Sequence, residues 1–366
     1  MSHQTPRRIL LSLTIACAIS LLSTSVASEE ASAKQSAPAP GKYDVSAITF
    51  DTSGKTLRVG YRDGKIATID LGKKRGTLRT ADRDKNPIVA VAPNGRSAVI
   101  DASPVAIIET KRGKHLAEIS KFKHLEDAVY SRDGELLLIS GPDKLLIWKD
   151  ADDLDSLAKK GIRLEEYLAR QDGDQLVTIG EMHARMDLSD DAEHPSLLFG
   201  DREGLLTLWN MGNRSEANFI AKLPLPHTIR TIHREIALVA SASDSLLHVF
   251  YHKDGKRLSW NKTLHVHAAL STSPGILLVH DDAIALHDPE DGHVLWRQQA
   301  DEDTTFSSES LCGLVKWSSE KTHRLALCHE QTIHIYDTES GELLASFQRQ
   351  KSKISALKIK KKKKAS

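Results

Sequence analysis

A repeat of about forty residues constrains the fold of this chain more than any other feature of its sequence. Seven short apolar segments recur, each with an aromatic residue, a histidine or an isoleucine just before the turn that ends it. These residues are Ile69, Ile108, Trp148, Trp209, Phe250, His287 and Tyr336. The successive intervals are 39, 40, 61, 41, 37 and 49 residues, so five of the six lie near forty. Self-similarity at such a period is typical of repeat architectures.

Glycine turns divide the period into short strands. Gly54, Gly95, Gly134 and Gly275 lie 12 to 15 residues before one of these seven residues. Gly113, Gly255, Gly292 and Gly341 lie five residues after one of them. The full period reads strand, glycine turn, strand, polar turn, strand, glycine turn, strand. Four short antiparallel strands per repeat are typical of a β-propeller blade. The sequence therefore predicts an all-β fold, a seven-bladed β-propeller of four-stranded antiparallel blades that occupies residues 43–359.

The ends of these segments also carry a family resemblance. The pairs Ile69-Asp70, Trp148-Lys149, Trp209-Asn210 and Tyr336-Asp337 resemble the strand ends of WD-repeat blades. Residues 284–298, with Trp296 after the turn, are similar to a pyrroloquinoline-quinone-type repeat. The resemblance covers about residues 45–350 and implies the propeller fold. It does not imply the quinone, because the many binding residues of such enzymes are not recognisable in this sequence, and we expect no cofactor.

The long interval between Trp148 and Trp209 is one period plus an insertion of about twenty residues. Within residues 151–174, apolar side chains recur at roughly helical spacing, at Leu154, Leu157, Ile162, Leu164 and Leu168. We predict a short helical insertion between blades three and four. It is either a partner-binding helix or a connecting loop with one helical turn.

Residues 1–28 have the three-part order of a secretory signal peptide. Arg7 and Arg8 precede an apolar run, and Val26 and Ser28 occupy the small-residue positions before Glu29. This pattern predicts cleavage between Ser28 and Glu29. The mature protein is then periplasmic or secreted.

Residues 29–42 are rich in Ala, Ser and Pro and lack an apolar period, which predicts a flexible linker before the fold. A retained membrane anchor over residues 9–26 is the alternative to cleavage. The serines and threonines of this run and its missing far-side flank make it a poor membrane span. We therefore expect no stable membrane span after processing.

Charge is distributed unevenly along the chain. Two of the 50 basic residues lie in 1–28 and eight lie in 351–366, which leaves 40 against all 49 acidic residues in 29–350, a net charge of −9. An acidic body argues against a broad nucleic-acid-binding face, so we expect no nucleic acid as a partner. Residues 360–366 are predicted to be a disordered basic tail. Its run Lys360–Lys364 is either solvated or binds an anionic surface, such as membrane lipid or an acidic partner.

Two segments are candidates for the strand that closes the predicted propeller. Residues 354–359 (ISALKI) resemble residues 45–50 (VSAITF) in pattern, so the two ends of the chain either compete for the ring-closing blade or share it. Closure matters because it removes the exposed edges of an open array of sheets.

Cys312 and Cys328 lie in one predicted hairpin. If its turn centres near Glu320, the two cysteines are direct cross-strand neighbours, at a separation that disulfide geometry allows. An oxidising compartment keeps such a pair joined. We therefore predict a Cys312–Cys328 disulfide. Two reduced core thiols are the alternative if the register slips by one residue or the chain is not exported.

Histidines are concentrated in one stretch, where nine of the 17 lie between residues 227 and 293. Loops that enter the inner strands of a propeller gather at one mouth of its channel. The candidates for a metal site at that mouth are His227, His265, His267, His280 and His329. Such a set suits copper, zinc or the edge of a haem. The spacing matches no fixed metal motif, and structural or exposed histidines are the alternative.

No catalytic constellation is recognisable in the sequence. It contains no nucleophile elbow, HExxH, glycine-rich phosphate loop or CxxC motif, so we name no catalytic and no cofactor-binding residue. Propellers offer rigid faces built from variable loops. The predicted function is therefore that of a non-enzymatic, exported scaffold or accessory subunit that binds protein partners in an envelope or respiratory complex. A metal- or redox-cofactor-binding propeller and a propeller hydrolase of the lactonase type are the alternatives.

Overall fold

The structure is a computed structural model of the chain. It describes residues 44–358 except for the segments 120–124, 126, 142–143, 160, 164–186, 189–195, 201–204, 211–216, 223–226, 234–235, 242–246, 252–256, 260–266, 273–274, 301–304, 307–309 and 320–321. Contacts divide the chain into Met1–Pro38 and Ala39–Ser366, and all described residues lie in the second unit. The predicted signal peptide, its Ser28–Glu29 cleavage site, the linker and the tail 360–366 therefore lie outside the described residues.

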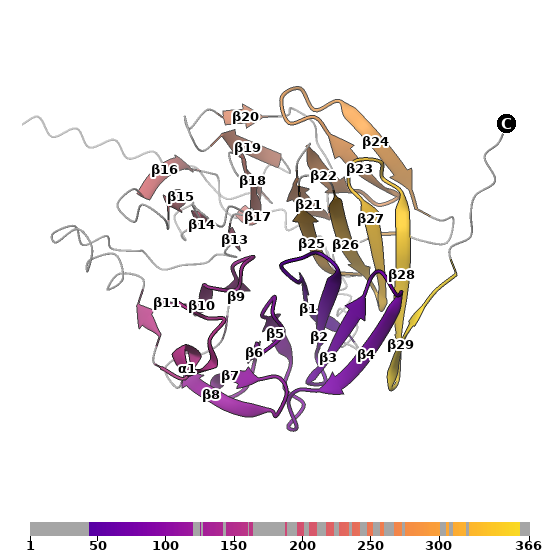
Figure 1. The fold of residues 1–366 in the computed structure, drawn as a ribbon. Coiled ribbons are helices and arrows are strands. Elements are labelled where there is room, and N and C mark those ends of the chain that lie inside the picture. The colour runs from indigo at the N-terminus through magenta and orange to yellow at the C-terminus, as the bar shows by residue number, and fades with distance from the viewer. Residues whose placement is uncertain are drawn as a thin grey trace, which may run out of the picture. The chain divides into compact units, whose positions relative to one another are not determined.

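The described residues form seven antiparallel sheets in chain order (Figure 1). The first contains β1 (Val45–Phe50), β2 (Thr56–Tyr61), β3 (Lys65–Asp70) and β4 (Arg75–Thr80). The second contains β5 (Ile88–Val91), β6 (Ser97–Ile100), β7 (Val105–Glu109) and β8 (Lys114–Ile119). The third contains β9 (Asp127–Tyr130), β10 (Leu137–Gly141), β11 (Lys144–Trp148) and β12 (Ile162–Arg163).

The remaining four sheets follow the same plan. The fourth contains β13 (Asp187–Leu188), β14 (Ser196–Gly200), β15 (Leu205–Asn210) and β16 (Ala217–Lys222). The fifth contains β17 (His227–His233), β18 (Ile236–Ser241), β19 (Leu247–Tyr251) and β20 (Arg257–Ser259). The sixth contains β21 (Ala268–Ser271), β22 (Ile276–Val279), β23 (Ala283–His287) and β24 (Val294–Gln299). The seventh contains β25 (Leu311–Ser318), β26 (His323–His329), β27 (Thr332–Asp337), β28 (Leu343–Gln350) and a fifth strand, β29 (Lys353–Ala356).

These sheets confirm the predicted all-β fold of four-stranded antiparallel sheets. Each of the seven apolar segments of the repeat forms the third strand of its sheet, and neighbours in sequence pair with each other. The middle strands are buried on both faces, as in β6, β10, β22 and β23, where every residue is buried. The outer strands β4 and β24 instead alternate exposed with partly buried residues. An apolar run therefore predicts a central strand, and an alternating one predicts an edge.

In the described part of residues 151–174, the predicted helical insertion has one helical turn. This turn is α1 (Leu154–Leu157), which is capped by the Asp153 side chain. Ile162, expected on the same helical face, lies instead in β12, because the chain returns here to add the fourth strand to the third sheet. Leu164 and Leu168 lie outside the described residues.

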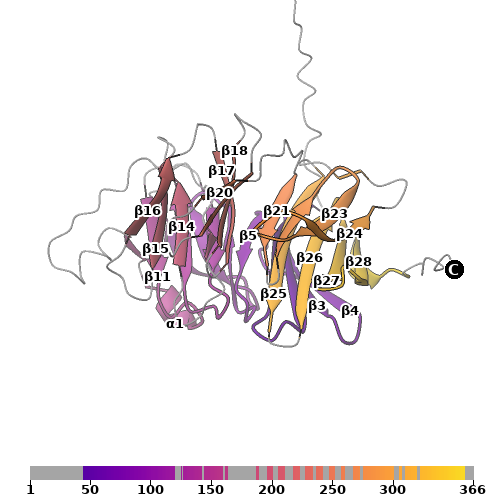
Figure 2. The same cartoon turned by 90° about the horizontal axis from the view of Figure 1, so that it is seen from above.

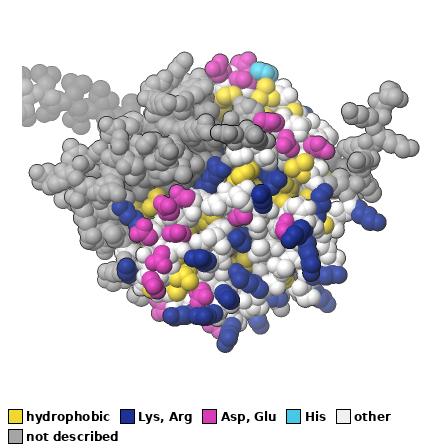
Figure 3. All heavy atoms as spheres, in the orientation of Figure 1, with side chains coloured by type: hydrophobic (Ala, Val, Ile, Leu, Met, Phe, Trp, Pro, Cys, Tyr) yellow, Lys and Arg dark blue, Asp and Glu magenta, His cyan; other side chains and the backbone are white. Residues whose placement is uncertain are grey.

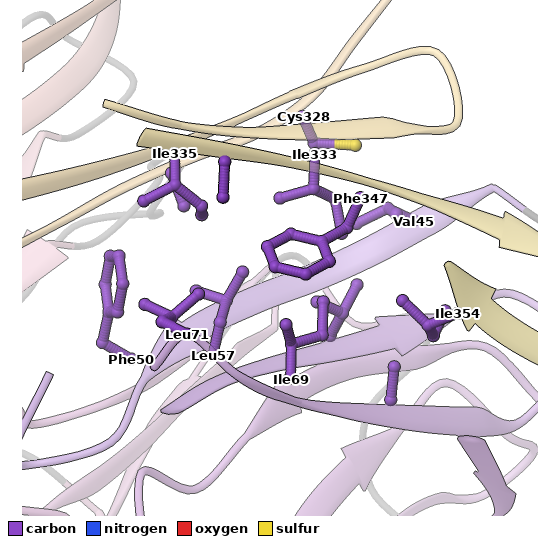
Figure 4. Packing of buried hydrophobic residues seen from close by; sticks show 14 of the residues in the cluster. Val45, Phe50, Leu57, Ile69, Leu71, Cys328, Ile333, Ile335, Phe347 and Ile354 are labelled. Atoms are coloured by element: carbon purple, nitrogen blue, oxygen red, sulfur yellow. The ribbon is translucent and has the colours of Figure 1, made fainter. Parts of the chain in front are cut away.

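The core lies between the faces of neighbouring sheets. One cluster joins the first and seventh sheets and includes Leu57, Ile69, Ile333 and Phe347, each at most 2% exposed (Figure 4). Similar clusters lie between the first and second, the second and third, and the sixth and seventh sheets. First strands contact each other in order, β1 with β5, β5 with β9, β9 with β13, β13 with β17, β17 with β21 and β21 with β25, and β25 contacts β1. Figure 2 shows the seventh sheet beside β3 and β4 of the first.

A buried ion pair crosses the junction between the first and seventh sheets. Both terminal nitrogens of Arg349 on β28 donate to the carboxylate of Asp63, which lies in the turn after β2, and the Nη1–Oδ1 distance is 2.9 Å. The two side chains are 1% and 4% exposed. The Arg349 Cζ atom also lies 4.3 Å from the centroid of the Tyr61 ring. Such a bidentate pair fixes the orientation of both side chains.

Trp317 of β25 contacts the same junction. Its Nε1 donates to the carbonyl of Thr52 at 3.2 Å, and its ring lies against Gly54. A Cβ atom on Gly54 would be 2.1 Å from the ring, and the residue has a φ of +65°. Only glycine satisfies both conditions, which explains the glycine turn at this point of the sequence.

The two candidate closing segments go to different sheets. Residues 45–50 form β1 of the first sheet, whereas β29 pairs with β28 as an additional outer strand of the seventh. The side chain of Ile354 is 7% exposed because it packs over Gly76 of β4, where a Cβ atom would be 2.5 Å from that of Ile354. β29 therefore fastens the seventh sheet to the outer strand of the first.

Helical structure in the described part of the chain is too short to cross a bilayer. None of its helices reaches the length and apolar character of a membrane span.

Candidate functional site

A pocket of about 190 Å³ lies between the first strands of four sheets. Its lining comes from residues 47–50 of β1, 89–91 of β5, 128–132 in and after β9, and 315–317 of β25. These are the C-terminal parts of the four strands. The pocket is smaller than those that hold drug-sized ligands, which measure about 300–1,000 Å³. It suits a small molecule or a single side chain.

Positive charge predominates in this pocket. Arg132 and Lys316 are the ionised residues of its described lining, which includes no carboxylate, histidine or cysteine. The Arg132 Cζ atom lies 5.5 Å from the centroid of the Trp317 ring, so a cation of the third sheet faces an aromatic ring of the seventh. Tyr130 shares a hydrogen bond of 3.1 Å with Ser97, and burial raises the pKa of the Tyr130 hydroxyl well above its usual value. The two cations of this lining suit an anionic group.

The described histidines of the predicted metal set lie at the opposite end of the strands. His267 precedes β21, His280 follows β22 and His329 ends β26. The start of a first strand and the end of a second strand share one end of a sheet, because the two strands pair antiparallel. His227 is the first residue of β17, and His265 lies outside the described residues.

Two of these histidines have local partners. The His267 ring pairs with the exposed carboxylate of Asp281. His329 Nε2 lies 3.3 Å from the carbonyl of Thr305, and its ring meets that of Phe306 edge-on at 5.1 Å. In the part of the chain that the structure describes, the predicted histidines form no group of three with metal-ligand spacing.

A different set with metal-ligand spacing lies in the turn between β23 and β24. The ligand atoms of Asp288, Asp291 and His293 lie within 4.8 Å of one another. Asp291 Oδ1 accepts a bond from the backbone N–H of His293 at 2.9 Å and lies 2.6 Å from its Nδ1. These contacts, the backbone bond first, lower the pKa of the Asp291 carboxyl. The bonds close an exposed turn, which is a sufficient explanation for the grouping.

Cys312 and Cys328 form a disulfide in the structure, with a Cα–Cα distance of 5.2 Å. The predicted direct opposition of the two residues is wrong by one position. Cys328 lies opposite Gly313, and Cys312 is the additional residue of a bulge between Leu311 and Gly313. The bond still forms because disulfides span Cα–Cα distances of about 4.4–6.8 Å.

Comparison with known proteins gives a fold match only. No protein-family model matches the chain, and no curated protein sequence matches it. Among solved structures, the computationally designed Ika8 protein is similar, with a TM-score of 0.55 and 17% sequence identity. The match covers 87% of this chain and 92% of the designed chain. At this identity the likeness concerns the fold alone.

Proposed function

We propose that this chain is a seven-bladed β-propeller that acts as an exported binding scaffold, an accessory subunit of an envelope or respiratory complex. The observation that carries the proposal is the sequence of contacts between first strands, which returns from β25 to β1. Blades of a propeller meet in this way around their axis. The loops that connect the strands then gather on two faces, where partners bind.

The junction between the first and last sheets supports a rigid scaffold. The Asp63–Arg349 pair, the Trp317 ring and β29 all join segments from the two ends of the described chain. A frame held in this way presents its loops in a fixed geometry, so that the loops lose little conformational entropy when a partner binds.

The outer strand β24 supports a role in protein binding. Val294 and Leu295 on this edge strand are 48% and 42% exposed. Exposed apolar side chains on an unpaired strand edge are a common site for strand addition or for docking of a partner.

The disulfide supports export. Such bonds persist in oxidising compartments such as the periplasm, and they are rare in the reducing cytosol. Together with the signal-like residues 1–28, the bond supports our proposal of a mature protein in the periplasm or outside the cell. N-terminal sequencing of the native protein is expected to start near Glu29, and an intact Met1 in a cytosolic fraction would contradict export.

Native size-exclusion chromatography of a detergent extract of the envelope tests the scaffold role. The protein is expected to elute in a complex well above the 40.4 kDa of its own chain. A variant with Val294→Lys and Leu295→Lys is expected to shift toward the monomer if β24 is the docking edge. Elution of the wild-type protein as a monomer alone, also after mild crosslinking, would contradict a scaffold role.

A further inference from the structure

A band of basic side chains extends over β4 and the residues after it, the turn before β8, and β29. We define this basic band as residues 73–85, 111–114 and 351–358. Its exposed cations are Lys73, Lys74, Arg75, Arg79, Arg83, Lys85, Lys111, Arg112, Lys114, Lys351, Lys353 and Lys358. The same segments hold two carboxylates, Asp82 and Asp84, and Asp82 is 3% exposed and bonded to the backbone of Asn86. The band is therefore strongly positive on a chain whose body is acidic.

The three segments of the basic band lie side by side. Ile354 of β29 packs over Gly76 of β4. At the other end of β4, Arg79 Nη2 donates to Thr110 Oγ1 at 2.7 Å, next to segment 111–114. Figure 3 shows Lys and Arg side chains gathered along the lower and right margin of the molecule, where β4, β8 and β29 lie in Figure 1. The cations thus share one continuous surface.

Internal ion pairs account for little of this charge. Lys73 pairs with Asp70 at 3.6 Å, and Lys74 Nζ donates to the carbonyl of Leu344. Arg79 bonds to Thr110, as described above. The side chains of the remaining nine cations have no hydrogen-bond or ion-pair partner among the described residues. Outer strands often carry lysines that prevent pairing with another chain, but this does not fully explain the basic band. The outer strand β24 has only one cation and carries two exposed apolar side chains.

The basic band includes one large exposed apolar side chain, that of Leu357. It is 39% exposed and is one of three large hydrophobic residues that are exposed in the described part of the chain. Its backbone N–H donates to the carbonyl of Ser346 at 2.8 Å, which holds the residue in place beside Lys358. Apolar side chains among lysines are typical of segments that lie in a membrane interface. Surfaces that bind single-stranded nucleic acid instead carry exposed aromatic rings for base stacking, and none of these three residues is aromatic.

We propose that the basic band docks this protein on the surface of an anionic lipid bilayer, with Leu357 in the headgroup region. Each lysine or arginine close to such a surface contributes about 1 kcal/mol, or about fivefold in affinity. Binding of this kind needs no protein partner, so it is independent of the scaffold role. The sequence continues after Lys358 with Lys360–Lys364, which adds charge of the same sign.

Vesicle flotation of the purified full chain tests the proposal. We expect binding to phosphatidylcholine vesicles that contain 30% phosphatidylglycerol, no binding to pure phosphatidylcholine vesicles, and a steep loss of binding as salt rises. A variant with glutamine at Lys351, Lys353 and Lys358 is expected to bind about a hundredfold more weakly. The matched variant with arginine at the same positions keeps the charge and is expected to bind like the wild type.

A second pair of variants separates lipid insertion from charge alone. Leu357→Ser is expected to weaken vesicle binding by about tenfold, since a partly buried leucine side chain is lost from the interface. Leu357→Met keeps an apolar side chain at this position and is expected to bind vesicles like the wild type. Melting curves show that each variant is folded.

Several results would overturn the proposal. Equal binding to neutral and anionic vesicles would exclude an electrostatic surface, and unchanged binding of the glutamine variant would exclude the basic band. Loss of binding on deletion of residues 360–366, with the glutamine variant unaffected, would assign lipid binding to the tail instead. Tight binding of duplex DNA that competes fully with vesicles and is insensitive to Leu357→Ser would identify the surface as a general polyanion site.

Discussion

Replacement of Arg349 by methionine tests the buried ion pair at the junction of the first and seventh sheets. Methionine keeps most of the length and apolar volume of the arginine stem but removes both hydrogen bonds to Asp63. Asp63 is then left as a carboxylate that is 4% exposed. Lys65 remains as a weaker partner, because its Nζ lies 3.9 Å from Asp63 Oδ2 and its side chain is 30% exposed.

The cost follows from the buried Asp63 charge, which Lys65 compensates only in part. Removal of one partner of a buried ion pair destabilises a protein by about 3–5 kcal/mol. The entropy of unfolding is about 2.1 cal/mol/K per residue, which gives about 0.65 kcal/mol/K for a fold of this size. We therefore expect Arg349→Met to lower the Tm by about 5–8 °C.

Calorimetry at neutral pH measures this effect against two controls. Arg297→Met breaks an ion pair with Asp282 in which the two side chains are 44% and 56% exposed, and it should lower the Tm far less, because solvent screens an exposed pair. The double variant Asp63→Leu, Arg349→Met removes both charges and should recover most of the lost stability. If Arg349→Met and Arg297→Met proteins melt at the same temperature, the reasoning is refuted.

Three further predictions concern the disulfide, a buried tyrosine and the last strand. Thiol counting on the unfolded, unreduced mature protein should find no free thiol. Replacement of Cys312 and Cys328 by serine should lower the free energy of unfolding by about 3 kcal/mol. An unchanged melting curve of that variant would contradict a stabilising bond. Burial raises the pKa of the Tyr61 hydroxyl above its unfolded value of about 10. The folded state therefore keeps a proton that the unfolded state loses, and stability should fall as pH rises above about 10, with no tyrosinate absorbance from Tyr61 before unfolding. A chain that ends after Lys353 loses the buried Ile354 and should melt at a lower temperature, whereas a chain that ends after Ile359 should melt like the wild type; equal melting of all three would show that β29 adds nothing to stability.

Strand content was predictable because its signals are local. Alternation, short apolar runs and glycine turns act over a few residues, and they recur seven times in this chain. Gly54 and Gly95 are examples of such local signals. Their φ angles are +65° and +70°, a conformation that a tight turn between two strands requires and that glycine adopts easily. Each repeat could therefore be assigned to one sheet without knowledge of its neighbours.

Register at the disulfide was not predictable from hairpin symmetry. The bulge that displaces Cys312 lies beside Gly313, and a Cβ atom on Gly313 would be 2.7 Å from Ile48 of β1. The close approach of β25 to β1 thus accompanies the irregular pairing, and it involves residues more than 250 positions apart in the chain. No pattern within the hairpin carries that information.

The candidate sites likewise depend on contacts between distant residues that the sequence does not reveal. Sequence reasoning selected histidines by their number and missed the pocket, whose cations Arg132 and Lys316 come from the third and seventh sheets. It noted the terminal lysines but missed the larger basic band. The runs Lys73–Arg75 and Lys111–Lys114 are visible in the sequence, but the net charge of the body conceals them.

The sequence by itself determined the number of repeats, the strands within each and the residues that their turns require, because these depend on backbone preferences and on burial over short distances. The tertiary structure decided which side chains from distant repeats meet. Asp63 finds Arg349, Gly54 lies against Trp317, and Ile354 packs over Gly76, because the seventh sheet packs against the first. Such contacts depend on the three-dimensional path of the whole chain, which no local periodicity encodes.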